Sequence, residues 1–442
     1  MIQYDIETLE RIVADLLAEA KRQGATQAEA GVHAQEGLDV TVRLGETESV
    51  EHSNDHGLGV TVYFDHRKGS ANTTDLRPEA IRETVAAACS IARHTSEDPA
   101  AGLADPELMA REISDLDLDH PWEIDPTEAA NIARRCEEAA RAHDPRICNS
   151  EGATVHSGRG LFVYGNTHGF VGGYPSTRHS ISCAILAEQD GDMQRDYWYT
   201  NSRVPEKLKA PESVGEEAAR RAVARLNPRK IDTTECPVLF KAEVAAGLMY
   251  ALFNALRGPA LYRRASFLLD MLGEPIFPDW VRISENPHIP QGLGSAPFDN
   301  EGVATLTRDI VSQGVLRGYI LDSYSARKLG TQTTGNAGGV RNPRIDSSGE
   351  TFEQLITRMG RGLLVTELMG QGSNTVTGDY SRGAAGFWIE DGRIAYPVAE
   401  ITVAGNLRQM FDGLLAVGCD NDIPGAVDTG SWLIDRMTVA GN

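Results

Sequence analysis

GQGSNTVTGDYSRGAAGFWIEDGRIAYPVAEITVAGN, residues 370–406, is the stretch that decides how the C-terminal half of this chain folds. Asp391-Gly392 separates two short runs, and this dipeptide suits the two φ > 0 positions of a type I′ hairpin turn. After Pro397, apolar and polar residues alternate as far as Val403, so we expect a further strand with one buried face. Six glycines precede that strand, which predicts a glycine-rich loop beside a rigid sheet.

Four polar residues follow Gly378 directly, and we expect them to form one close cluster: Asp379, Tyr380, Ser381 and Arg382. Such a cluster would serve a site or an interface. A nucleophile elbow requires G-x-S-x-G between a strand and a helix, and Ser381 lacks that spacing and is followed by strands. The pattern therefore favours a structural loop over a serine nucleophile.

The composition describes a globular, acidic chain. Of the 442 residues, 41% are hydrophobic, and 42 Lys and Arg stand against 63 Asp and Glu, a formal charge of −21. An excess of acid disfavours binding to phosphate backbones, so we expect no nucleic-acid partner. The six cysteines are scattered without a CxxC pair, which is typical of reduced thiols in the cytosol.

The N-terminal segment is acidic and amphipathic, unlike a signal peptide, and no apolar run is long enough to span a membrane. We therefore expect a cytoplasmic protein with no membrane partner.

Periodicity predicts an α+β fold in two domains, residues 1–229 and 230–442. Helices are expected over residues 6–23, 78–94 and 126–143, the last capped by Asp125, around antiparallel strands. Ser213 and Glu216 predict a capping box for a fourth helix that ends near Leu226. The second domain is expected to be antiparallel and β-rich, with a helix at residues 242–256 that is buried on most sides.

Histidines offer two further candidates. His179 is a possible general base, but nothing pairs it with Ser381, and a hydrogen-bonded histidine near a turn is favoured. His52 and His56 would share a face of a helix, but their surroundings predict a turn between strands, which favours a solvated hairpin over a metal site.

Acidic and thiol candidates are weaker still. Asp115, Asp117 and Asp119 lack the glycine and distal glutamate of a calcium loop, so a solvated segment is favoured. Acidic residues follow Cys419 closely and would oppose thiolate formation, so we expect an inert thiol. Taken alone, the residues predict no convincing catalytic set.

Several collinear segments resemble one family, and the resemblance spans almost the whole chain. They are GGYPSTRHSISCAILAE, YRRASFLLDMLGEPIFPDW, APFDNEGV, SYSARKLG, GNAGG, VTELMGQGSN, GDYSRGAAGFWIEDG and YPVAEITVAGNL. These resemble the TldD/PmbA metalloproteases, and specifically the PmbA (TldE) branch, once called a modulator of DNA gyrase. The resemblance implies a cytoplasmic protease of two related subunits, in which an HExxxH helix and a later cysteine of the TldD-type subunit bind zinc.

The helix that matches this motif reads AEVAAG at residues 242–247. Ala242 and Gly247 stand where the histidines would be, and only the glutamate remains, as Glu243. Residues 427–434 hold no cysteine, and Cys419 comes too early to replace it. The resemblance thus implies no catalytic residue, metal or other cofactor in this chain, and zinc in a TldD-like partner.

The implied role is a non-catalytic subunit that joins a TldD-like partner and helps to enclose an extended peptide. The residues expected to face the peptide or the partner are Arg178, His179, Asp379, Tyr380, Ser381 and Arg382. A homodimer of the isolated chain remains open. Two alternative functions also remain: a self-sufficient homodimeric metallohydrolase, and a non-enzymatic regulator of the DNA gyrase modulator type.

Overall fold

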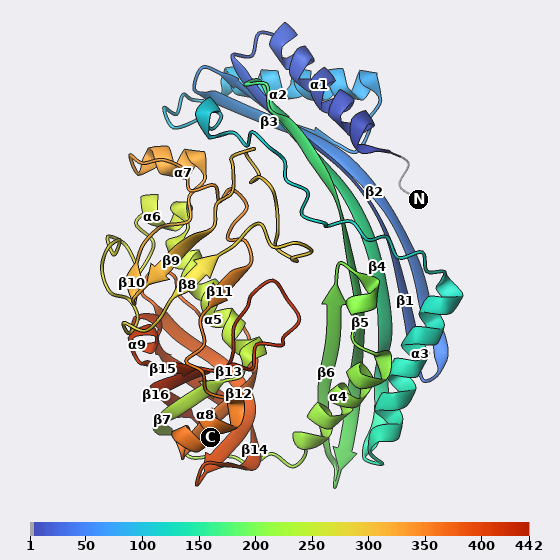
Figure 1. Ribbon diagram of the computed structural model, residues 1–442, viewed down its shortest axis with the longest axis vertical. Coiled ribbons are helices and arrows are strands. Elements are labelled where there is room, and N and C mark those ends of the chain that lie inside the picture. Colours follow the sequence, from blue (N-terminus) through green and yellow to red (C-terminus); the bar gives the residue numbers. More distant parts are fainter. Residues whose placement is uncertain (1–3, 442) are drawn as a thin grey trace.

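A computed structural model describes residues 4–441 of the chain (Figure 1). The α-helices are α1 (Ile6–Arg22), α2 (Pro78–His94), α3 (Pro126–His143), α4 (Pro211–Ala224), α5 (Ala242–Leu256), α6 (Gly258–Tyr262), α7 (Ser323–Lys328), α8 (Phe352–Met359) and α9 (Leu407–Asp412). The strands are β1 (Gln27–Arg43), β2 (Glu46–Phe64), β3 (Arg67–Thr73), β4 (Ile147–Asn166), β5 (Val171–Gln189), β6 (Asp192–Ser202), β7 (Thr234–Phe240), β8 (Ile283–Glu285), β9 (Arg308–Ser312), β10 (Val315–Leu316), β11 (Pro343–Ile345), β12 (Gly362–Met369), β13 (Asp379–Glu390), β14 (Arg393–Asn406), β15 (Leu414–Val417) and β16 (Trp432–Ala440).

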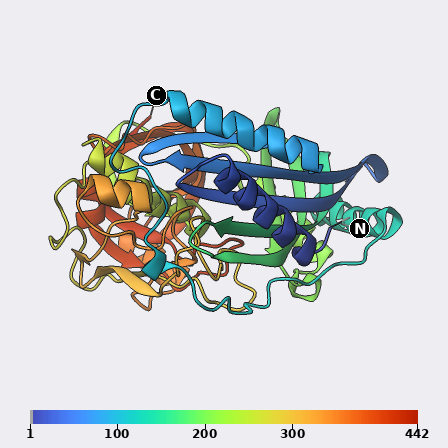
Figure 2. The same cartoon turned by 90° about the horizontal axis from the view of Figure 1, so that it is seen from above.

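The N-terminal half is one antiparallel sheet with strand order β3-β2-β1-β4-β5-β6. Its long strands bend around the C-terminal half, and α1 to α4 lie on the outer, convex side (Figures 1 and 2). In β1 the buried residues alternate from Ala28 to Val42, and their side chains pack beneath these helices. The intervening residues project from the opposite, concave face, which is turned toward the C-terminal half.

The helix predictions for this half are confirmed, with one correction at α4. Asp125 caps α3 and forms a capping box with Glu128. The box expected from Ser213 and Glu216 is absent, because α4 begins at Pro211 and its N-cap is Ala210, three residues before Ser213. The Ser213 hydroxyl instead donates to the carbonyl of Ala210.

The turn predicted around His52 and His56 is wrong, because β2 runs straight through this segment. The two histidines lie opposite Leu38 and Ala34 of β1. Four residues apart on one strand, they share a face but are separated by roughly 13 Å, too far to bind one ion.

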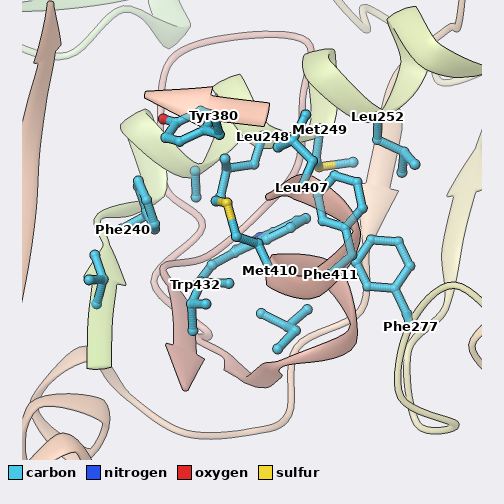
Figure 3. Packing of buried hydrophobic residues seen from close by; sticks show 14 of the residues in the cluster. Phe240, Leu248, Met249, Leu252, Phe277, Tyr380, Leu407, Met410, Phe411 and Trp432 are labelled. Carbon is cyan, nitrogen blue, oxygen red and sulfur yellow. The ribbon is translucent and has the colours of Figure 1, made fainter. Parts of the chain in front are cut away.

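The C-terminal half contains a sheet that closes on itself. Its order is β14-β13-β12-β7-β16-β15, and β14 also pairs with β16. These pairings are antiparallel except that of β12 with β7. The expected buried helix is confirmed as α5, whose Leu248, Met249 and Leu252 pack near Phe411 and Trp432 (Figure 3).

The hairpin at Asp391-Gly392 is confirmed, with φ values of 49° and 68° at its two central residues. The surrounding strands are longer than predicted. β13 begins at Asp379, so the four polar residues lie in a strand rather than in a loop. β14 passes through Pro397 without a break, so no separate strand follows that residue.

The two halves are held together by polar and aromatic contacts. The hydroxyl of Tyr324 donates to Asp98 at 2.7 Å, and that of Tyr199 donates to the Pro424 carbonyl at 3.0 Å. Phe298 packs edge-on against Tyr174 and Phe170. Long-range contacts therefore fix the concave face of the sheet relative to α5 and the closed sheet.

Candidate functional site

The first turn of α5 holds the glutamate that the family motif retains. Glu243 accepts a hydrogen bond from Arg221 of α4 at 2.6 Å and pairs with Lys241 at 3.1 Å. Arg221 also lies 3.4 Å from Asp196 and stacks over the ring of Trp198 at 4.7 Å. Glu243 is thus part of an ion-pair network that joins α5 to α4 and β6.

This network determines the charge of Glu243. Burial alone would raise its pKa, but the cations of Lys241 and Arg221 outweigh burial, so the pKa lies below its ordinary value. An ionised carboxylate with a low pKa, held by two cations, is a weak base. In this structure the carboxylate of Glu243 thus links α5 to α4 through its ion pair with Arg221.

The residues around Glu243 do not fit a zinc ion. Ala242 is 1% exposed and offers only a methyl group, and Gly247 has no side chain. Across residues 4–441, no group of three or more His, Cys, Asp or Glu side chains could hold a metal. A Cβ added at Gly247 would meet nothing within 4 Å, so the space for a larger side chain exists while the ligand does not.

The polar residues of β13 lie on two faces of the strand, which corrects the expectation of one cluster. Asp379 and Ser381 are exposed, and Asp379 accepts from the hydroxyl of Thr377 at 2.7 Å. Tyr380 is 3% exposed and lies beside Phe240 at the edge of the core (Figure 3). Burial raises the pKa of Tyr380 to about 12.

Arg382 shares the inner side of β13 with Tyr380. The hydroxyl of Tyr380 and the Nε of Arg382 are both buried, and neither has a hydrogen-bond partner among the described residues. Ser381 is tied to the preceding loop, because its backbone N–H donates to the Gly372 carbonyl at 2.7 Å. The start of β13 is thus held against the loop at Gly372 through its backbone.

Arg178 and His179 point to opposite faces of β5. The side chain of Arg178 is exposed on the concave face. His179 is 1% exposed, and its ring bonds to the hydroxyl of Ser157 at 3.1 Å and to the carbonyl of His120 at 2.9 Å. Burial lowers the pKa of His179. Its two ring nitrogens are occupied, so no pairing with Ser381 exists.

The remaining candidates do not converge. Asp119 binds Arg159 through both carboxylate oxygens, whereas Asp117 contacts His120, so the three aspartates of residues 115–119 do not face one ion. Cys419 is exposed and free.

Two sets of interactions on the concave face were not predicted from the sequence, because the residues that form them are far apart in the chain. The Nδ1 of His156 lies 2.9 Å from Asp39, 117 residues earlier. Arg203 is 9% exposed and donates to the carbonyls of Thr177, Gly292 and Leu293. Neither the His156–Asp39 contact nor the hydrogen bonds of Arg203 correspond to a pattern of nearby residues in the sequence.

Three consecutive regions of the chain match domain models of one protein family. Residues 28–92 match domain 1, residues 119–226 the central domain and residues 233–441 the C-terminal domain of the PmbA/TldA metallopeptidases. The chain belongs to the PmbA/TldD metallopeptidase family.

Curated relatives identify the branch. The metalloprotease PmbA of Escherichia coli O157:H7 is 52% identical over 96% of this chain and 94% of its own length. A PmbA homolog from Haemophilus influenzae is 47% identical over 100% of this chain and 98% of its own length. A TldD homolog from the same species is only 22% identical over 88% of this chain and 87% of its own length. The chain therefore falls in the PmbA branch.

Solved structures share the fold. A candidate modulator of DNA gyrase from Bacteroides thetaiotaomicron superposes with a TM-score of 0.93 at 27% identity, covering 98% of this chain and 99% of its own. TldE from Thermococcus kodakarensis gives a TM-score of 0.85 at 21% identity over 97% and 100% of the two chains. The expected family, branch and α+β fold are confirmed.

Proposed function

We propose that this chain is the metal-free, PmbA-type subunit of a two-subunit cytoplasmic metalloprotease that degrades or processes unfolded, extended peptides. In this proposal the zinc and the catalytic groups belong to a TldD-like partner. The observation that carries the proposal is the state of the motif helix: Ala242 and Gly247 offer no ligand, and Glu243 is held by Arg221 and Lys241.

The concave sheet supports a role in enclosing a peptide. Gly31 of β1 lies opposite Gly59 of β2, and Gly37 lies opposite Gly158 of β4. Positions without side chains let another backbone approach closely, and an extended peptide can be held through its backbone groups.

No helix among residues 4–441 is long and apolar enough to cross a membrane.

The roles of individual residues form part of the proposal. We assign Arg178 to the peptide-facing wall, and the outward-facing Asp379 and Ser381 to the partner-facing surface. His179, Tyr380 and Arg382 support these walls from behind. We also propose that the domains divide at residues 229 and 230, in the connection between α4 and β7.

Proteolysis of an unstructured peptide tests the proposal. We expect the purified chain alone to be inactive, and a mixture with a TldD-like subunit from the same organism to cleave the peptide until a chelator removes its zinc. Glu243→Gln in this chain should leave cleavage by the mixture intact, because the carboxylate is not the base. Chelator-sensitive proteolysis by the isolated chain would instead support the self-sufficient metallohydrolase.

A further inference from the structure

The concave face of the N-terminal sheet carries a pocket of about 400 Å³ at the boundary with the C-terminal half. Its floor includes three glycines of β1 and β4: Gly37, Gly158 and Gly160. Arg178, Arg203 and His156 line it from the sheet side, and Leu293 lines it from the C-terminal half. The pocket is therefore lined by polar side chains, and its floor is formed by the exposed backbone of the glycines.

The floor glycines keep this hollow open. A Cβ added at Gly37 would lie 2.6 Å from the hydroxyl of Ser53, and one added at Gly158 would lie 2.9 Å from the Nε2 of His156. Both distances are shorter than van der Waals contact, so a side chain at either position would displace a polar group that lines the pocket. A ligand can instead approach the backbone closely.

The two arginines of the pocket lack a carboxylate partner. Arg178 is exposed, and no carboxylate among residues 4–441 forms an ion pair with it. Arg203 uses its guanidinium on three backbone carbonyls, each at 3.0 Å. Burial lowers the pKa of Arg203, and the nearby charge of Arg178 lowers it further. The two positive charges are therefore close enough to affect each other, and neither arginine forms an ion pair with a carboxylate among residues 4–441.

The acidic residues nearby are engaged elsewhere. Asp39 binds His156, which leaves the Nε2 of that ring directed over Gly158. Asp55 contacts Gln35 and His33 of β1. Glu36 is also one of the residues that line the pocket, but along β1 its side chain lies with those of Ala34 and Leu38 toward the convex face, where its charge acts on Arg159. The chain as a whole carries −21, but salt screens distant charges over about 8 Å, so the two arginines dominate inside the pocket.

We propose that this pocket binds a carboxylate of the extended peptide, held mainly by the guanidinium of Arg178 with Arg203 behind it. The inference rests on the proposed function, because that function brings the peptide to the concave face. Arginine binds a carboxylate through two parallel N–H···O bonds, and the glycine floor lets the adjoining peptide backbone lie against the sheet. The carboxylate belongs either to the C-terminus of the peptide or to an acidic side chain.

Binding of fluorescent peptides to the isolated full chain tests the site without a partner or zinc. Three peptides share one unstructured sequence: one has a free C-terminus, one is amidated, and one is amidated with a single internal glutamate. We expect at least one carboxylate peptide to bind roughly 10-fold or more tightly than the neutral amide. Whichever of them gains affinity identifies the source of the carboxylate.

Arg178→Gln should abolish this preference, and Arg178→Lys should retain part of it. Arg82→Gln is the matched control, because it removes one positive charge from an exposed pair with Glu79 on α2, away from the concave face. Equal affinity for the three peptides, no binding at all, or an unchanged preference in Arg178→Gln would overturn the inference. Chelator-sensitive cleavage by the two-subunit mixture is measured separately, so the proposed function can stand when this site fails.

Discussion

At the scale of single residues, Glu243 matches the glutamate of the family motif but has different neighbours. In the zinc motif implied by the resemblance, the glutamate acts beside two histidines. Here Ala242 and Gly247 replace them, and the carboxylate binds Arg221 and Lys241 instead. Removing one partner of a buried ion pair leaves the other charges uncompensated, which costs more than the pair itself contributes.

Glu243→Gln should therefore lower the free energy of unfolding by about 1–3 kcal/mol at pH 7. The folded pKa of Glu243 lies below its ordinary 4.5, so its contribution is complete above that value and is lost as the pH falls through the folded pKa. Urea denaturation at pH 7 and pH 4 measures both effects. The control Glu212→Gln, which breaks an exposed pair with Arg135, should cost less than about 1 kcal/mol. An effect of Glu243→Gln no larger than this control would contradict the structural role.

Residue identities revealed the missing ligands but not the network that replaces them. Ala242 and Gly247 exclude side-chain ligation from the sequence alone. Lys241 lies two residues before Glu243 in the sequence, but Arg221 comes from α4 and also pairs with Asp196 of β6. Neither Arg221 nor Asp196 carries a local sequence signal of that contact. In the same way, alternation within β13 separates Tyr380 from Ser381, whereas the glycines around them predicted a single loop cluster.

At the scale of secondary-structure elements, two glycines without strained φ angles have opposite roles. Gly247 lies in α5, where an added Cβ meets nothing within 4 Å. Gly386 lies in β13, where an added Cβ would come within 1.9 Å of the Leu364 carbonyl oxygen on β12. Gly247 lowers the stability of α5, whereas Gly386 allows β13 to pack closely against β12.

Gly247→Ala should raise the free energy of unfolding by roughly 0.5–1 kcal/mol, because alanine restricts the unfolded chain and favours the helix. Gly386→Ala should lower it by about 2 kcal/mol or more, because the strands must separate to admit the methyl group. Thermal and urea denaturation of the two variants provide the comparison. Destabilisation by Gly247→Ala would show that the open space beside α5 is occupied.

Helices whose ends are marked by proline or a capping residue could be predicted from the sequence, whereas strands made mostly of polar residues could not. Residues 78–94, 126–143 and 242–256 were expected as helices and are α2, α3 and α5, because proline, caps and apolar spacing agree there. β2 escaped prediction around His52 because most of that segment is exposed on both faces, so no alternation marks the strand. Pairing with β1 imposes the extended conformation instead.

At the scale of the whole molecule, buried acids lie where the two halves meet. Burial raises the pKa of Glu301 to about 7, and the nearby carboxylate of Asp299 contributes to the rise. Burial likewise raises the pKa of Asp299 to about 6. The charge of Glu301 acts on Tyr63 and Tyr164 of the N-terminal sheet, both of which donate to Glu29. Ionisation of Glu301 therefore adds negative charge to a junction that already holds the carboxylates of Asp299 and Glu29.

The folded state keeps the proton of Glu301 up to about pH 7, whereas the unfolded chain releases it near its ordinary pKa of 4.5. The contribution of Glu301 to the free energy of unfolding is therefore fully present at low pH and is lost as the pH rises from 4.5 to 7. Glu301→Gln cannot ionise, so at pH 8 it should be about 1–3 kcal/mol more stable than the unsubstituted chain, with little difference at pH 5. Urea denaturation at both pH values measures this, with exposed Glu107→Gln as control. A difference that does not depend on pH would contradict this account of the junction.

Zinc content tests the central claim most directly. The chain and a TldD-like subunit from the same organism are purified separately, loaded with zinc, dialysed and analysed for tightly bound metal. We expect less than about 0.1 zinc per copy of this chain and about one per copy of the TldD-like subunit, because only deprotonated side-chain ligands in suitable number retain the ion. About one tightly bound zinc per copy of this chain would contradict the account.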